Sequence, residues 1–324
     1  MEFLAQLLNF GVVVFPVFDN QQIQQVNSAV ESSLRSFTEV SNYEGYAQKP
    51  ALANFGAVGT VSSFHHPTIR WLRKFIQRII LKLFSGFKLY GLEYVEILFD
   101  RIGCRVPKTQ EWGGGSISGE SWHRDQAPQE FMAELDQILG GWVNLNTNVT
   151  QGFVCIPGTH NTRADGSGFV KNFTPTEIEY FNQQKQLIEI PPGHAILFYQ
   201  HILHMVRNYT IKQRELRLFL GIRFTKSINP LFDQTKAIED QGIPTIPSGQ
   251  TPKLYESNHP RFHKDKIQNW STLFIPAMKT DNPALLLPAV SKSLREMSQL
   301  SGTNLMYEPY DQEDLQIMRP YPLN

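Results

Sequence analysis

The tetrapeptide Trp122-His123-Arg124-Asp125 has the residue types and the spacing of a metal site. In an extended strand, side chains at positions i and i+2 point to the same side, so His123 and Asp125 can bind one metal ion together. A histidine from a distant strand would complete a set of two imidazoles and one carboxylate. That set leaves coordination positions open and is the arrangement of non-heme Fe(II) oxygenases. A structural zinc would normally recruit thiolates as well.

A His-x-Asp pair alone is a weak signal, because the chain has nine histidines and a second pair, His263-Lys-Asp265, also occurs. No histidine follows this second pair, so it cannot be the first half of the same arrangement. The segment from His123 also resembles the catalytic loop of protein kinases. The Leu and Asn expected after that loop, and a Gly-rich phosphate loop, are missing, so we reject the kinase interpretation.

The second imidazole must come from His160, His194, His201 or His204. His194 follows Pro-Pro-Gly and is expected in a turn, and His160 is expected to be structural or to lie behind the ligands. His201 and His204 are three residues apart at the end of one expected strand, so they face opposite sides of it. One of them can therefore enter the site, and spacing alone does not say which.

Period-two alternation of apolar residues predicts the strands that must position these side chains. The expected strands cover residues 94–100, 142–146, 152–156, 187–190, 195–199 and 216–224, with Gly and Pro turns between them. No helix alternates with these strands, which disfavours a parallel α/β fold and favours a sandwich or barrel.

Ahead of these strands, the pattern predicts a strand over 11–18 and helices over 21–37 and 68–84. Asp19 or Asn20 is expected to cap the first helix. The basic residues of the second helix are expected on its solvated face: Arg70, Arg73, Lys74 and Arg78.

The composition is that of a packed globular protein, with 41% hydrophobic and 19% charged residues. Thirty basic residues balance thirty acidic ones, so no long-range field attracts nucleic acid or an anionic membrane. Cys104 and Cys155 cannot make a disulfide framework. With no basic leader and no long apolar run, we expect a cytoplasmic location.

Five segments, in the correct order, resemble the phytanoyl-CoA dioxygenase family of Fe(II)- and 2-oxoglutarate-dependent oxygenases. They are the strand and helix that follow Phe10, the His123-x-Asp125 strand, the Gly152…Pro-Gly-Thr-His160 turn, the Gly-His…Ile-Leu-His204 strand and the closing strand from Arg217. The resemblance covers residues 1–226 and leaves residues 227–324 without a counterpart.

This resemblance implies a fold that is mostly β with flanking helices (α+β). The core is expected to be a double-stranded β-helix, a cupin-like jelly roll, with N-terminal helices and a C-terminal extension. Residues 1–226 would form the oxygenase jelly-roll domain, and residues 227–324 an extension packed on the core. The resemblance further implies that His123, Asp125 and His204 bind Fe(II), with 2-oxoglutarate and O2 as co-substrates.

For 2-oxoglutarate, the resemblance implies that Trp142 packs against the chain and Arg217 binds the distal carboxylate. A guanidinium suits that carboxylate because it offers a planar, two-donor fork. Arg214 stays open as the clamp, because the family reaches its arginine in slightly fewer residues after the histidine. If Trp142 faces inward, Asn144 and Asn146 do too and line a pocket; the alternative is a half-exposed strand with both asparagines in water.

The activity implied is hydroxylation of an unactivated C–H bond in a small-molecule or lipid-like substrate, without nucleic-acid or membrane partners. One alternative is the same mechanism acting on a protein or a nucleic acid. Another is a non-catalytic jelly roll used for binding or structure, which Val206 favours because the family often has a serine there. The Gly-rich segment 113–119 would be either a mobile lid or a surface loop.

Overall fold

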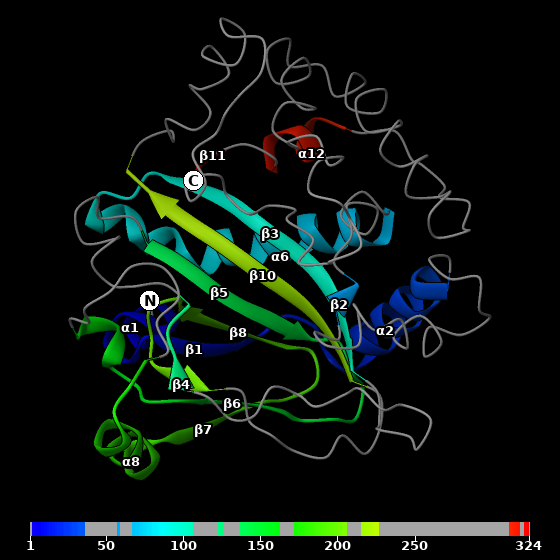
Figure 1. Cartoon of the computed structure of the whole chain (residues 1–324). Helices are drawn as coiled ribbons and strands as arrows, with labels where there is room; N and C mark the ends of the chain where they lie inside the picture. The colour runs from blue at the N-terminus through cyan, green and yellow to red at the C-terminus, as the bar shows by residue number, and fades with distance from the viewer. Residues whose placement is uncertain are drawn as a thin grey trace, which may run out of the picture.

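Two antiparallel β-sheets form the frame of the computed structural model (Figure 1). The structure describes residues 2–35, 57–58, 67–105, 122–125, 137–162, 172–205, 215–226, 311–317 and 321–323. Within these residues the larger sheet has seven strands, in the order β1-β8-β5-β10-β3-β11 with β2 paired to β3. The smaller sheet has four described strands, in the order β4-β9-β6-β7.

The chain passes repeatedly from one sheet to the other: β3 leads to β4, β5 to β6 and β8 to β9. The larger sheet contains β1 (Val12–Pro16), β2 (Ala57–Val58), β3 (Tyr94–Arg105), β5 (Gln137–Asn144), β8 (His194–Tyr199), β10 (Glu215–Thr225) and β11 (Tyr321–Pro322). The smaller sheet contains β4 (Trp122–His123), β6 (Gln151–Cys155), β7 (Gln186–Ile190) and β9 (His204–Met205). This alternation is the topology of a double-stranded β-helix, so the predicted jelly roll is confirmed.

Strand β5 begins at Gln137, well before the predicted start at residue 142. The prediction started too late because two glycines interrupt the apolar pattern ahead of Trp142. Gly141 lies against β8, where a Cβ atom would come within 2.0 Å of the Ile196 carbonyl oxygen. Glycine within a strand often marks such a close approach of two backbones. Gly141 therefore interrupts the strand pattern in the sequence and also allows β5 to pack closely against β8.

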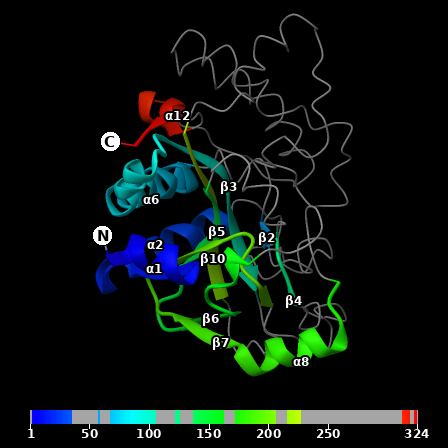
Figure 2. The same cartoon turned by 90° about the vertical axis from the view of Figure 1, so that its left-hand side faces the viewer.

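Helices cover the face of the larger sheet that is turned away from the smaller sheet (Figure 2). They are α1 (Glu2–Phe10), α2 (Asn20–Arg35) and α6 (Pro67–Phe84), and α6 continues into the 3-10 helix η1 (Ser85–Tyr90). Asp19 caps α2 as predicted, since its Oδ1 accepts hydrogen bonds from the backbone N–H groups of Gln21 and Gln22 at 2.9 and 2.8 Å.

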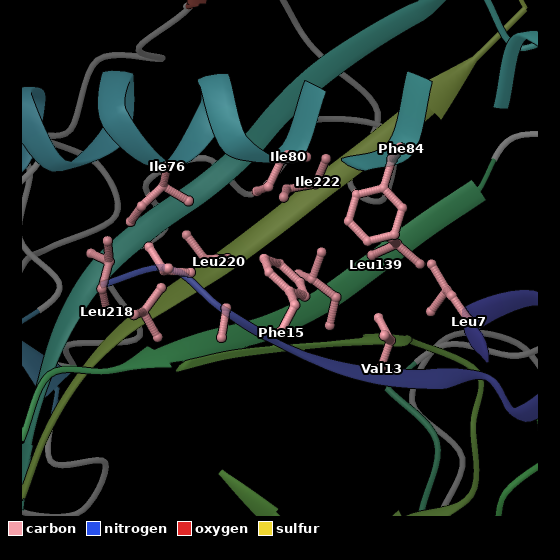
Figure 3. Packing of buried hydrophobic residues seen from close by; sticks show 14 of the residues in the cluster. Leu7, Val13, Phe15, Ile76, Ile80, Phe84, Leu139, Leu218, Leu220 and Ile222 are labelled. Atoms are coloured by element: carbon pink, nitrogen blue, oxygen red, sulfur yellow. The ribbon is translucent and has the colours of Figure 1, made fainter. Parts of the chain in front are cut away.

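The main hydrophobic core lies between these helices and the larger sheet (Figure 3). Leu7 of α1, Phe15 of β1 and Phe84 of α6 are fully buried there, together with Leu218 and Ile222 of β10. Burying a side chain of this size contributes about 1.5–3 kcal/mol, so this layer is a main source of stability. The opposite face of the sheet is thereby left for the site between the two sheets.

The prediction of a solvated basic face on α6 is wrong for Arg70 and Arg73 but right for Arg78, whose side chain is 66% exposed. Arg70 and Arg73 are buried. Helix α12 (Gln312–Ile317) packs on α6 and supplies acidic partners: Asp314 binds Arg70, and Asp311 lies 2.6 Å from Lys74 Nζ. Strand β11 also pairs with β3, so both described parts of the C-terminal region lie on the core.

Three described α-helices are absent from the sequence prediction: α1, α8 (Pro175–Gln184) and α12. Helix α8 begins with a capping box in which the side chains of Thr174 and Glu177 bond each other's backbone N–H groups. Its residue Asn182 accepts a hydrogen bond from Trp122 Nε1 at 3.1 Å. Helix α8 therefore supports the residue that precedes His123.

Several predictions fall on residues outside the described ranges. They concern the glycine-rich segment 113–119, Val206, Arg214, the second His-x-Asp pair at 263–265 and most of the extension from residue 227. None of the helices that the structure does describe has the length and apolar character needed to span a bilayer.

Candidate metal centre

His123, Asp125 and His204 come together at the pairing of β4 with β9. His123 lies directly opposite His204 in this antiparallel pair. One ligand atom from each of the three side chains lies within 4.8 Å of the others. The His123 Nε2 and His204 Nε2 atoms are 3.7 and 3.8 Å from the two carboxylate oxygens of Asp125.

These distances suit a metal ion between the three side chains. Ligand atoms about 2.1 Å from an ion and at right angles around it lie roughly 3 Å apart, so small side-chain movements would close the set. Both imidazoles are buried, whereas the Asp125 side chain is 38% exposed. The set is therefore open on the side of Asp125, as a site that takes further ligands requires.

The ring of His204 is oriented by its own turn. Its Nδ1 lies 3.0 Å from the carbonyl oxygen of Ile202, which selects the tautomer that donates from Nδ1 and leaves the Nε2 lone pair directed at Asp125. Burial lowers the pKa of His204, and the Asp125 carboxylate acts in the opposite direction. Burial thus favours the neutral imidazole that a metal ion needs.

Of the four candidate partner histidines, all of which the structure describes, His204 alone joins His123 and Asp125. His201 lies in the turn between β8 and β9, with its ring 6.3 Å from that of His160. His201 and His204 do point apart as predicted, but a turn separates them rather than the alternation of one continuous strand. His160 stacks on Tyr199 and its Nε2 lies 3.0 Å from the Leu8 carbonyl oxygen, which is a structural contact. His194 lies in the predicted turn, with Nδ1 3.0 Å from the Pro192 carbonyl oxygen.

Two phenylalanine side chains contact both His204 and Trp142, one of the predicted co-substrate residues. Phe153 and Phe198 stack at 4.4 Å, and each ring centroid lies 5.3 Å from that of His204. Trp142 contacts both phenylalanines edge-on, so it faces inward between the sheets. Aromatic side chains packed in this way form a wall that excludes water and strengthens electrostatic interactions beside it.

Arg217 lies over the face of Trp142, with Cζ 4.6 Å from the ring centroid. It pairs in register with Asn144 of β5, on the inner side of β10. A cation over an indole ring is held electrostatically. The structure therefore brings together the two residues predicted to contact 2-oxoglutarate, Arg217 and Trp142.

Asn144 faces inward, but its amide is already used within the protein. Its Nδ2 donates to the carbonyl oxygens of Val149 and Ile190 at 2.7 and 2.9 Å. Its Oδ1 accepts from the backbone N–H and the side-chain amide of Asn146 at 3.0 and 2.6 Å. These contacts make Asn144 a support of the turn after β5, and both asparagines are buried rather than facing water.

Sequence reasoning missed Glu215, a buried carboxylate beside Arg217. Its Oε2 lies 3.6 Å from Arg217 Nη2, and the two side chains are 5% and 10% exposed. The sequence does predict that Glu215 lies near Arg217, because residues 215 and 217 of one strand must point to the same side. Arg217 therefore has an acidic neighbour within the protein, with which a bound carboxylate would compete.

No family model matches the chain, and a search of curated proteins finds no match. Among solved structures, SnoN, a non-heme α-ketoglutarate-dependent epimerase from nogalamycin biosynthesis, is 14% identical and covers 69% of this chain and 82% of its own, with a TM-score of 0.45. EctD from S. alaskensis with bound Fe is 17% identical over 68% and 75% of the two chains, with a TM-score of 0.35. EvdO2 from Micromonospora carbonacea var. aurantiaca, complexed with 2-oxoglutarate, is 13% identical over 69% and 90%, with a TM-score of 0.38. Because these similarities are low, the functional assignment rests on the side chains described above.

Proposed function

We propose that the chain is a non-heme Fe(II)- and 2-oxoglutarate-dependent dioxygenase, related to the phytanoyl-CoA dioxygenase family, that hydroxylates a small-molecule or lipid-like substrate. The observation that carries this proposal is the group of His123, Asp125 and His204 around one point between two sheets of a jelly roll. Two imidazoles and one carboxylate suit Fe(II), and three protein ligands leave room for co-substrates.

Each of these residues has a defined task. His123 and His204 offer imidazole nitrogens from paired strands, and Asp125 offers a carboxylate at the exposed side of the group. Arg217 would bind the distal carboxylate of 2-oxoglutarate, with Trp142 against its chain. Iron and 2-oxoglutarate, when bound, supply the oxidising chemistry that attacks the C–H bond. The wall of Phe153 and Phe198 keeps water from one side of the site.

A small molecule is the proposed substrate because the inner wall is aromatic and the net charge of the chain is zero. A protein or nucleic-acid substrate would be attacked with the same three metal ligands, His123, Asp125 and His204. We propose a cytoplasmic location, where the buried free thiol of Cys155 would stay reduced.

A non-catalytic jelly roll is the second candidate, and Glu215 is the observation that favours it. A carboxylate within 3.6 Å of Arg217 already neutralises the proposed clamp. The His123, Asp125 and His204 group favours the enzyme over the non-catalytic candidate, because a protein without a metal has no evident use for two imidazoles and a carboxylate brought together.

Anaerobic titration with Fe(II) and then 2-oxoglutarate tests the proposal. The wild-type chain is expected to develop a visible metal-to-ligand charge-transfer band, and to form succinate when air is admitted. Asp125→Ala should lose both signals, whereas His160→Gln, outside the ligand group, should keep the band. A wild-type chain that binds the metal but develops no band with 2-oxoglutarate would favour the non-catalytic candidate.

A further inference from the structure

Arg124 lies between two proposed metal ligands in the sequence, yet the hydrogen bonds of its guanidinium reach two other segments of the chain. Strand alternation turns it away from His123 and Asp125. It is 5% exposed, and its Nη1 donates to the carbonyl oxygens of Thr159, at 2.8 Å, and of His201. Its Nη2 donates to Thr162 Oγ1 at 2.9 Å. A guanidinium is thus surrounded by neutral acceptors from two other segments.

These acceptors lie on two turns that are also bonded to each other. The first turn follows β6 and includes η2 (Thr159–Asn161), and the second joins β8 to β9 and ends at His204. Thr159 Oγ1 accepts from the Leu203 backbone N–H at 3.0 Å and donates to the Ile156 carbonyl oxygen at 2.7 Å. The Ile156 N–H donates to the Leu203 carbonyl oxygen at 3.0 Å. Arg124 therefore binds two turns that are hydrogen-bonded to each other.

The second turn is the one that orients His204. The Ile202 carbonyl oxygen, which lies 3.0 Å from His204 Nδ1, belongs to the residue directly after His201. The guanidinium holds the His201 carbonyl, while the backbone of Arg124 carries His123 and Asp125 on either side. Strands β4 and β9 pair over only two residues each, so backbone pairing alone gives them few hydrogen bonds.

We propose that Arg124 is a positioning residue of the metal centre: it fixes His204 relative to His123 and Asp125. This inference rests on the proposed function, namely that these three side chains bind a divalent metal ion. Residues behind metal ligands typically change metal affinity by about 10- to 100-fold when they are replaced. Lysine cannot replace Arg124, because one ammonium group does not match acceptors spread along a planar fork.

The test compares Arg124→Lys and Arg124→Ala with Arg70→Lys and Arg70→Ala in the full chain. Arg70 is the matched control, since it is also a buried arginine but binds Asp314 on α12. Anaerobic Co(II) titration gives the metal affinity and the visible band pattern, and thermal unfolding in chelator gives the stability of the metal-free protein. We expect both Arg124 variants to bind Co(II) at least about tenfold more weakly, with an altered band pattern. Guanidinium ion, at concentrations that do not unfold the protein, should partly restore Co(II) binding to Arg124→Ala.

The Arg70 variants should lose thermal stability but keep the wild-type Co(II) affinity and spectrum. If the Arg124 variants bind Co(II) as tightly as the Arg70 variants, with the wild-type spectrum, the positioning role is refuted while the proposed function stands. If Arg124→Ala fails to fold, Arg124→Lys decides, because it retains the charge and most of the side-chain volume. If the wild-type chain takes up neither Co(II) nor Fe(II), the proposed function fails, and the inference fails with it.

Discussion

Replacing Glu215 by glutamine tests how a dicarboxylate would bind Arg217. The Glu215 and Arg217 charges are 3.6 Å apart and largely buried. At an effective dielectric constant of about 20, unit charges at this separation attract by about 4–5 kcal/mol. The cost of desolvating the pair offsets much of that attraction. If about a third of this attraction remains after desolvation, the net gain is about 1.4 kcal/mol. That corresponds to roughly tenfold tighter binding of 2-oxoglutarate to Glu215→Gln.

The assay is anaerobic titration of the Fe(II)-loaded protein with 2-oxoglutarate, followed through the charge-transfer band. Glu189→Gln is the matched control, because Glu189 is an exposed carboxylate on β7. The metal-loaded Glu215→Gln protein should also gain more thermal stability from 2-oxoglutarate than the wild type does, since a tighter ligand stabilises more at equal concentration. Unchanged or weaker binding by Glu215→Gln, with normal binding by Glu189→Gln, would refute the idea that Glu215 competes for Arg217.

Two further predictions concern stability. Burial lowers the pKa of His201 from its ordinary value of 6.5 to about 4. The unfolded chain therefore binds this proton at higher pH than the folded chain, and stability falls as the pH drops from about 6.5 towards 4. His201→Gln should show a smaller loss in urea unfolding between these pH values, and an equal loss would contradict the assignment. Asp314→Ala should cost about 3–5 kcal/mol because it breaks a buried ion pair with Arg70. Glu313→Ala, whose partner Arg78 is exposed, should cost less than about 1 kcal/mol, and equal small losses in chemical denaturation would show that α12 contributes little.

The strands and the ligand group were accessible from the sequence for a physical reason. Period-two burial and the i, i+2 rule are local properties, so they identify β8 and β10 and the shared face of His123 and Asp125 without knowledge of the fold. The choice of His204 over His201 depended on the family resemblance, because alternation only says that the two face opposite ways. The position of His204 opposite His123 depends on contacts between distant parts of the chain, so only the structure shows it.

The failures have equally specific causes. Arg70 looked like a solvated residue because its partner, Asp314, lies 244 positions further along the chain. The inward direction of Asn144 was predictable, whereas its acceptors, Val149 and Ile190, were not, because they belong to a turn and to another strand. In each case the sequence indicates the direction of a side chain, and the partner is set by tertiary packing.

The two strands that carry His123 and His204 contain two residues each. Segments with so few ladder bonds are the regions that open at low free energy in native proteins. A bound ion would crosslink them, and by mass action its contribution to folding would grow with the concentration of free metal. Cellular iron supply would then govern the lifetime of the protein as well as its turnover. A chain without bound iron would then show faster amide exchange and earlier protease cleavage at β4 and β9 than the iron-loaded chain does.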